Sequence, residues 1–197
     1  MRYVIMAGGP ARRWNNYNNT TKHLMKIGNE NMLQRIVRQL KENNITENIY
    51  ITSNNPLYEV EGVVRNELIY DNKVYNMFYY KFLDDEITFL YGDTYYSDKV
   101  IKDIIDSNTK DVLFFGNEKS IVGIKVKDYE KFKKYVDDIK GEEGQVGWAM
   151  YRRVNNLDSN DINCTNFRFV SDIVKNINRP SDYKELMEEE NKVDDIK

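Results

Sequence analysis

The sequence predicts a single α/β domain with a mostly parallel central sheet and helices on both faces. The chain opens with a short apolar run, Tyr3–Ala7, that stops at Gly8-Gly9, which is typical of a buried strand feeding a loop. Strand-like and amphipathic helical segments then alternate along the chain, as they do in α/β proteins. No internal repeat and no long Pro/Gly/Ser linker divides it. Its 197 residues are enough for one such domain to bury a core.

The first part of the chain predicts a strand, a helix and a second strand. After the turn Gly28-Asn29, apolar residues recur at the spacing of one helix face from Met32 to Leu40, and Asn43-Asn44 ends that helix. Asn48–Thr52 is the second short strand. Two strands joined in this way are expected to be parallel, with a right-handed crossover.

The second part repeats this theme. Glu86–Tyr91 is the clearest central strand and ends at Gly92-Asp93, and Ser97-Asp98 then caps a helix. The other expected strands are Leu68–Tyr70, Asp111–Phe115, Ser120–Val126 and Phe167–Val170, and the other expected helices are Tyr75–Leu83, Asp128–Ile139, Val146–Val154 and the segment from Ser181. Residues 75–83 would also fit a strand, although a helix is favoured. The order predicts a Rossmann-like domain over residues 1–186 and a charged C-terminal tail over 187–197.

The composition restricts the expected partners. Lys and Arg number 29 against 32 Asp and Glu, a formal net charge of -3, so there is no basic excess to hold nucleic acid. The single cysteine, Cys164, cannot form an internal disulfide, which predicts a reducing, cytoplasmic setting with Cys164 as a small buried hydrophobe. No apolar run has the length of a membrane span or a signal peptide. We therefore expect a monomer or homodimer that binds neither nucleic acid nor membrane.

A glycine loop with basic residues follows the first strand. Gly8 and Gly9 allow backbone amides to approach phosphate oxygens closely, because glycine lacks the side chain that would keep a ligand away. Arg12, Arg13 and Lys22 can neutralise a polyphosphate. The spacing is neither that of a P-loop nor that of a dinucleotide fingerprint. Taken alone, a Gly-Gly turn beside basic residues is equally compatible with a solvated turn.

Three segments, in this order, carry a family resemblance: Ala7-Gly8-Gly9-x-x-x-Arg13, Lys22-His-Leu-Met-Lys-Ile-Gly28 and Phe89-Leu-Tyr-Gly-Asp93. Their order resembles the nucleotidyltransferase superfamily, which includes sugar-phosphate nucleotidyltransferases, phosphocholine cytidylyltransferases and molybdenum-cofactor guanylyltransferases. The resemblance implies a GT-A-like fold, an NTP and a small phosphorylated metabolite as substrates, Mg²⁺ as cofactor and release of pyrophosphate. By motif match, the nucleotide-binding residues would be Ala7, Gly8, Gly9, Arg12, Arg13 and Lys22. Arg13, Lys22 and Asp93 would be catalytic, with Asp93 also holding the metal.

The chain departs from the family pattern at several positions. Ala11 and Thr21 stand where the family usually has Gly and Pro. The segment Asn176-Ile-Asn-Arg-Pro-Ser-Asp-Tyr183 resembles a C-terminal motif whose first residue, usually Asp, supplies the second metal ligand. Asn176 occupies that place here, and Asp172, four residues earlier, is the other candidate metal ligand. An amide oxygen lacks charge, so Asn176 would bind Mg²⁺ more weakly than a carboxylate would.

Four residues are open to both a structural and a functional interpretation. His23, the only histidine, lies beside Lys22 and could touch a phosphate, although a structural role is favoured. Trp148 and Tyr151 lie at helical spacing, which favours core packing over an acceptor-binding wall. Asp98 could join the site or serve only at the helix start.

The resemblance is nearly absent from residues 54–85, so the sequence does not select the nucleobase, and cytidylyl transfer is only slightly favoured. The acceptor could be a phosphocholine-like compound, a sugar 1-phosphate or another phosphometabolite. One alternative is a GT-A glycosyltransferase, although Thr94 and Tyr95 follow Asp93 where that class has a second acid. Another is a non-catalytic nucleotide-binding protein.

Overall fold

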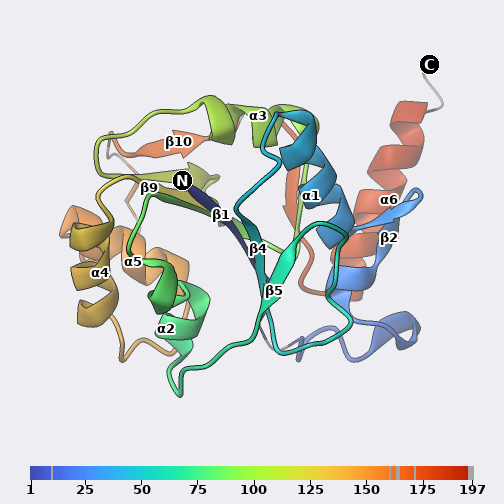
Figure 1. The fold of residues 1–197 in the computed structure, drawn as a ribbon. Helices are drawn as coiled ribbons and strands as arrows, with labels where there is room; N and C mark the ends of the chain where they lie inside the picture. Colours follow the sequence, from blue (N-terminus) through green and yellow to red (C-terminus); the bar gives the residue numbers. More distant parts are fainter. Residues whose placement is uncertain (10, 160, 163–164, 171, 195–197) are drawn as a thin grey trace.

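A seven-stranded sheet forms the centre of the protein (Figure 1). The computed structural model describes residues 1–9, 11–159, 161–162, 165–170 and 172–194. The strands are β1 (Arg2–Met6), β4 (Ile49–Thr52), β5 (Val64–Asn66), β6 (Ile87–Tyr91), β8 (Val112–Gly116), β9 (Ile121–Val126) and β10 (Phe167–Phe169), in the order β10-β8-β9-β6-β1-β4-β5. Strand β9 runs antiparallel to β6 and β8, and the other neighbouring pairs are parallel. The expected mostly parallel sheet is confirmed.

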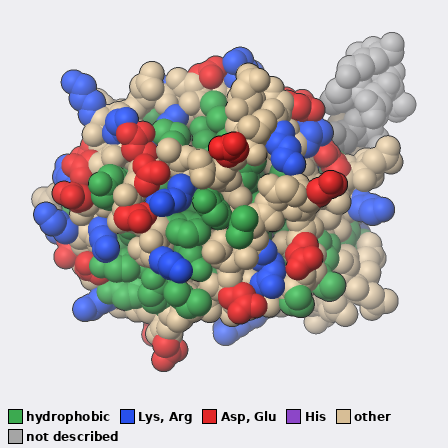
Figure 2. Space-filling model, in the orientation of Figure 1, with side chains coloured by type: hydrophobic (Ala, Val, Ile, Leu, Met, Phe, Trp, Pro, Cys, Tyr) green, Lys and Arg blue, Asp and Glu red, His purple; other side chains and the backbone are tan. Residues whose placement is uncertain are grey.

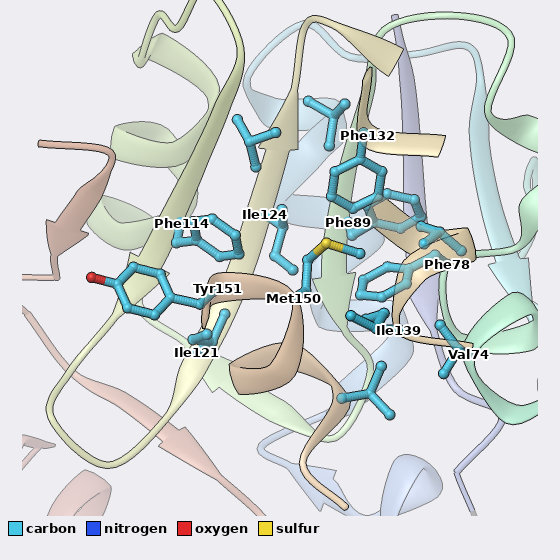
Figure 3. Packing of buried hydrophobic residues seen from close by; sticks show 14 of the residues in the cluster. Val74, Phe78, Phe89, Phe114, Ile121, Ile124, Phe132, Ile139, Met150 and Tyr151 are labelled. Atoms are coloured by element: carbon cyan, nitrogen blue, oxygen red, sulfur yellow. The ribbon is translucent and has the colours of Figure 1, made fainter. Parts of the chain in front are cut away.

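Helices cover both faces of the sheet because its strands are apolar on both sides. Along β1, Val4 and Met6 belong to one buried cluster, whereas Tyr3 and Ile5 belong to the other, so successive side chains point to opposite faces. Helices α1 (Met32–Glu42) and α3 (Asp98–Asp106) pack on the second cluster, and α2 (Lys73–Met77), α4 (Tyr129–Asp138) and α5 (Val146–Asn155) pack on the first. Figure 3 shows Phe78, Phe89 and Phe132 meeting in the first cluster, with ring centroids of Phe78 and Phe132 5.3 Å apart.

Side-chain caps begin the helices where the sequence suggested. The Asn31 side chain accepts from the Gln34 amide and the Gln34 side chain accepts from the Asn31 amide, each over 2.9 Å, which forms a capping box at the start of α1. Ser97 caps α3 and Asp128 caps α4 by accepting from the Val100 and Lys131 amides, respectively. These caps satisfy amides that the first helical turn leaves without partners.

The segment between β4 and β6 differs from the expectation. Residues 68–70 are not a strand; the strand is β5, Val64–Asn66, at the sheet edge. Residues 75–83 are split between the end of α2 and a short 3-10 turn, η3 (Tyr80–Phe82), because Tyr79 adopts a positive φ of 37° that interrupts the helix. Leu68 instead lines a cavity described below, and Ile69 is 60% exposed.

Short elements outside the main sheet complete the fold. The strands β7 (Thr94–Tyr96) and β11 (Val174–Asn176) pair antiparallel, and β2 (Lys26–Ile27) pairs with β3 (Glu30–Asn31). Short 3-10 turns lie at η1 (Tyr17–Asn19) and η2 (Lys22–Leu24), and the C-terminal helix α6 (Pro180–Asp194) crosses the expected boundary at residue 187. A third buried cluster, which includes Trp14, Tyr95 and Leu186, joins these pieces to the domain. Cys164 lies outside the described residues.

The surface is mixed in charge. On the face shown in Figure 2, Lys and Arg side chains are interspersed with Asp and Glu. Of the described helices, none combines the length and the apolar character that crossing a membrane requires.

Candidate functional site

Two cavities open beyond the carboxyl ends of β1, β4 and β6. The first, of about 330 Å³, is called the glycine-loop cavity and is lined by Met6, Gly8, Gly9, His23, Thr52, Leu68, Lys73, Asn76, Met77, Tyr91 and Asp93. The second, of about 310 Å³, is called the Trp148 cavity and is lined by Arg13, Lys73, Met77, Tyr91, Asp93, Lys119, Ser120, Ile121, Gly144, Gln145, Val146, Gly147, Trp148, Asn176 and Asn178. Lys73, Met77, Tyr91 and Asp93 line both, so the two cavities meet there. Ligands of α/β proteins usually bind at this end of the sheet.

The glycine loop presents bare backbone to the first cavity. A Cβ atom added at Gly8 would lie 2.4 Å from Leu68 Cδ1, so a larger residue would push Leu68 away from its place in the cavity wall. A Cβ atom at Gly9 would meet nothing within 4 Å. Ala7 is buried and its amide donates to the Thr52 carbonyl over 3.1 Å, so its polar group belongs to the sheet. Gly8 and Gly9 thus line the cavity, whereas Ala7 only extends the strand behind them.

Asp93 lies where the two cavities meet, just beyond β6. The Gly92 amide donates to the Met6 carbonyl over 2.9 Å and so holds this turn against β1. The Asp93 carboxylate forms an ion pair with the Lys22 ammonium. Their side chains are 19% and 6% exposed, respectively, so water screens this pair only partly. Two of the residues expected to be catalytic are therefore in contact.

The loop after Gly9 places Arg13, but not Arg12, at the site. Trp14 is buried and its Nε1 donates to the Thr20 carbonyl over 2.9 Å, which anchors the loop. Arg13 lines the Trp148 cavity and donates from Nη2 to Asn178 Oδ1 over 3.0 Å. Arg12 is exposed and lines neither cavity.

This loop turns without glycine. Four residues in it, Asn15, Asn16, Asn18 and Asn19, have φ between 50° and 54°. Asparagine tolerates this left-handed region better than other residues with a side chain, because its short polar side chain can bond to the local backbone. The two Asn-Asn pairs therefore let the loop curve back from Arg13 toward Lys22.

The pairing of β11 with β7 brings Asn176 beside Asp93. Asn176 is in register with Thr94, whose hydroxyl donates to Asn176 Oδ1 over 2.5 Å. The Ile177 amide donates to the Asp93 carbonyl over 2.7 Å. Asp172, in contrast, accepts a 2.9 Å hydrogen bond from the Ser97 hydroxyl and lines neither cavity. Of the two candidate second ligands, only Asn176 thus shares a cavity with Asp93.

The donor atoms at this junction suit a hard cation that keeps most of its own water. Among the described residues, no group of three His, Cys, Asp or Glu side chains could enclose a metal ion. Asp93 and Asn176 instead offer one carboxylate and one amide oxygen to the same cavity. Mg²⁺ is usually bound through one or two protein oxygens, and waters and substrate phosphates complete its shell. The residues therefore fit Mg²⁺ that binds together with a polyphosphate.

His23 is a buried wall residue of the glycine-loop cavity. Its side chain is 2% exposed, and its Nδ1 lies 2.9 Å from the Tyr58 hydroxyl. Burial lowers the pKa of His23 to about 4, an effect that the neighbouring Lys22 reinforces and Asp93 opposes. The imidazole is therefore neutral near pH 7.

The buried His23 is expected to make the protein less stable as the pH falls. Its folded-state pKa of about 4 lies below the ordinary value of 6.5, so from pH 6.5 to pH 4 the unfolded state binds a proton that the folded state does not. The unfolding free energy should fall across this window by as much as about 3 kcal/mol from His23 alone. Chemical unfolding at pH 7, 5.5 and 4.5 measures the loss. If the unfolding free energy of a His23→Gln variant fell with pH as steeply as that of the parent protein, this assignment would be wrong.

Trp148, Tyr151 and Asp98 are mainly structural. Trp148 is 5% exposed, stacks on Phe167 with ring planes 8° apart and presents only a small part of its surface to the second cavity. Tyr151 is buried, and its ring meets Phe114 edge-on. Asp98 accepts from Gln39 Nε2 over 2.8 Å and lines neither cavity.

Sequence reasoning missed two lysines of the site. Lys73 lies at the start of α2 and lines both cavities, and its ammonium donates to the backbone carbonyls of Glu143 and Gly144 over 2.5 and 2.9 Å. Lys119 lies in the turn between β8 and β9 and lines the Trp148 cavity. Neither lysine belongs to a motif, and only the fold of the chain brings them into the lining of a cavity that Asp93 also lines.

Comparison with solved structures finds proteins with the same architecture. CTP:phosphocholine cytidylyltransferase from Streptococcus pneumoniae has a TM-score of 0.64 and 18% identity, over 95% of this chain and 97% of that one. A protein described as a glucose-1-phosphate thymidylyltransferase from Bacillus anthracis has a TM-score of 0.68 and 18% identity, over 95% and 94%. Inositol-1-phosphate CTP transferase from T. maritima has a TM-score of 0.62 and 10% identity, over 95% and 94%.

No protein-family model matches the sequence, and no curated protein matches it significantly. The structural likeness nevertheless extends over nearly the whole of each chain compared. It agrees with the resemblance carried by the glycine loop, Lys22 and Asp93. The chain therefore has the same α/β fold as these solved structures.

Proposed function

We propose that the protein is a nucleotidyltransferase that transfers the NMP part of an NTP to a small phosphorylated acceptor and releases pyrophosphate. The observation that carries this proposal is the position of Asp93, in contact with Lys22, at the junction of two cavities. One cavity has a wall of bare glycine backbone, and the other is lined by Arg13 and two lysines. Two substrates in these cavities would meet at Asp93. The fold shared with nucleotidyltransferases supports the same reaction class.

In the proposed reaction, a phosphate oxygen of the acceptor attacks the α-phosphorus of the NTP, and the bond to the β-phosphate breaks. The nucleophile is already ionised, so no general base and no covalent enzyme intermediate is needed. The difficulty is the repulsion between two anions, which fixed cations reduce when they are placed where the charge develops. Lys22 and Arg13 are the cations proposed for this role. Lys73, which lines both cavities, is a further candidate.

Asp93 and Asn176 are the residues that would hold Mg²⁺. When bound, the ion would supply charge neutralisation at the phosphates of the NTP. The protein's own contribution is to position the two oxygens: the ladder of β7 with β11 fixes Asn176, and the turn after β6 fixes Asp93.

A direct experiment tests the proposal. The protein is incubated with each of the four NTPs, Mg²⁺ and a panel of phosphorylated acceptors, and pyrophosphate is measured. CTP is the first nucleotide to test, because two of the similar structures are CTP-dependent enzymes by their description. Release of pyrophosphate that requires both an acceptor and Mg²⁺ is the expected result. Binding of NTP without any such release would favour the non-catalytic alternative.

A glycosyltransferase is disfavoured by the residues after Asp93. Thr94 and Tyr95 lie in β7 and are buried, so this segment offers no second carboxylate for a metal-bound nucleotide sugar.

Asn176→Asp is expected to lower the Mg²⁺ concentration needed for half-maximal activity, by about three- to tenfold, because a charged oxygen ligand binds a hard cation more tightly. Thr94 can donate to a carboxylate as it does to the amide, so the local hydrogen bond can remain. Asp172→Ala should change this concentration by less than about twofold, since Asp172 lies at Ser97 outside both cavities. The opposite result, with Asp172→Ala damaging and Asn176→Asp neutral, would move the second ligand to Asp172.

A further inference from the structure

The Trp148 cavity has an unusual charge balance. Three cations line it, Arg13, Lys73 and Lys119, and the only carboxylate among its described lining residues is Asp93. Asp93 is already paired with Lys22. No ion pair between any of the three cations and a carboxylate is found among the described residues, although such pairs are common elsewhere on the protein. The cavity is therefore a positively charged site with little compensation.

The other polar groups of the cavity are neutral and can both donate and accept hydrogen bonds. They belong to Tyr91, Ser120, Gln145, Asn176 and Asn178. Asn178 accepts from Arg13 through its Oδ1, which leaves its amide NH₂ group for other partners. A cluster of hydroxyl and amide groups of this kind suits a ligand that carries several hydroxyl groups, because each can serve as donor or acceptor in turn.

The cavity offers little to a quaternary ammonium group, because its one described carboxylate, Asp93, is already paired with Lys22 and its aromatic lining residues are Tyr91 and the largely covered Trp148. Such groups are held over the faces of aromatic rings or beside carboxylates. One face of Trp148 is covered by Phe167, and Tyr151 packs edge-on against the same indole, which leaves Trp148 only 5% exposed. Lys119 and Lys73 would also repel a second positive charge in a cavity of this size.

We propose that the acceptor is the phosphate ester of a neutral, hydroxyl-bearing compound, a sugar or polyol phosphate, and that Lys119 helps to exclude phosphate esters of quaternary amines. This inference rests on the proposed function and narrows its acceptor. Lys119 acts as a specificity residue: its turn is ordered by Asn117, whose Oδ1 accepts from the Lys119 and Ser120 amides over 2.9 and 3.0 Å. These hydrogen bonds order the backbone of the turn that brings Lys119 into the lining of the cavity.

The test compares four acceptors with the NTP that gives most pyrophosphate: glycerol 3-phosphate, glucose 1-phosphate, phosphocholine and 3,3-dimethylbutyl phosphate. The last has a carbon in place of the quaternary nitrogen of phosphocholine and so matches its shape without its charge. The better of the two hydroxylated acceptors is expected to have a kcat/KM at least about 100-fold above that of phosphocholine. The carbon analogue should exceed phosphocholine by about tenfold, since only its charge differs.

A charge reversal tests the role of Lys119. Lys119→Glu should raise the KM for the hydroxylated acceptor by about tenfold or more and leave the KM for NTP within about twofold. It should also reduce the ratio of kcat/KM for the hydroxylated acceptor to kcat/KM for phosphocholine. Lys110→Glu makes the same charge change at an exposed lysine that lines neither cavity, so it should leave both KM values and the preference over phosphocholine unchanged.

The two proposals fail in different ways. Equal or better turnover of phosphocholine than of either hydroxylated acceptor would overturn the acceptor inference and leave nucleotidyl transfer standing. If Lys119→Glu left the preference for the hydroxylated acceptor over phosphocholine unchanged, Lys119 would have no role in selecting the acceptor. No pyrophosphate with any acceptor and any NTP would overturn the proposed function, and the acceptor inference with it.

Discussion

Asp93→Asn is expected to lower kcat by about 100-fold or more, which corresponds to a loss of about 2.7 kcal/mol in transition-state stabilisation. The substitution keeps the volume of the side chain but removes the one charged oxygen ligand that the described part of the cavity junction offers. It also removes the partner of the Lys22 ammonium. Initial rates of pyrophosphate release over a range of Mg²⁺ concentrations measure the effect.

A matched control separates chemistry from folding. Asp98→Asn makes the same change five residues later, at a carboxylate outside both cavities, and should leave kcat within about twofold. Thermal unfolding of each variant shows whether it is folded at the assay temperature. A folded Asp93→Asn protein that keeps more than about a tenth of the parent kcat, a loss of less than about 1.4 kcal/mol, would argue against a metal-binding role for this residue.

The central part of the fold could be predicted because its signals are local and repeated. Helix α1 has an apolar face and a capping box, and β6 is an apolar run that ends at a Gly-Asp turn. Such patterns depend on neighbours a few residues apart. The edge strand β5 gave no such signal, since only Val64 of its three residues is apolar and its side chain is exposed. Its place is set by pairing with β4, a contact between segments distant in sequence.

The candidate site was predictable only where its residues follow a motif. Gly8, Gly9 and Asp93 stand at strand ends, so the parallel sheet brings them together, and Asn176 could be placed through its resemblance to a C-terminal motif. The choice of Asn176 over Asp172 depended on the antiparallel pairing of β11 with β7, which places Asn176 opposite Thr94. Two such short strands have too little pattern for a prediction from sequence.

Lys22→Met is expected to raise the Kd for NTP by at least about tenfold and to lower kcat by about 100-fold, because the ammonium at the cavity junction is the cation proposed to face the phosphates. Calorimetric titration with NTP gives the Kd, and pyrophosphate release gives kcat. Arg12→Ala removes an exposed cation that lines neither cavity, so it should change both values by less than about twofold. If Lys22 served only to hold Asp93, Lys22→Met would lower the melting temperature while the Kd for NTP stayed the same.

The contact between Lys22 and Asp93 makes their joint variant the sharpest test of the site. Residues that act as one unit give strongly non-additive losses, whereas independent residues give losses that add. Each single variant leaves an opposite charge without its partner in a largely buried place, and the double variant leaves neither. We therefore expect the variant with both Lys22→Met and Asp93→Asn to lose about as much kcat as the worse of the two single variants and to be more stable than at least one of them. A loss equal to the product of the two single losses would mean that the two side chains act separately, and that their ion pair has no part in the reaction.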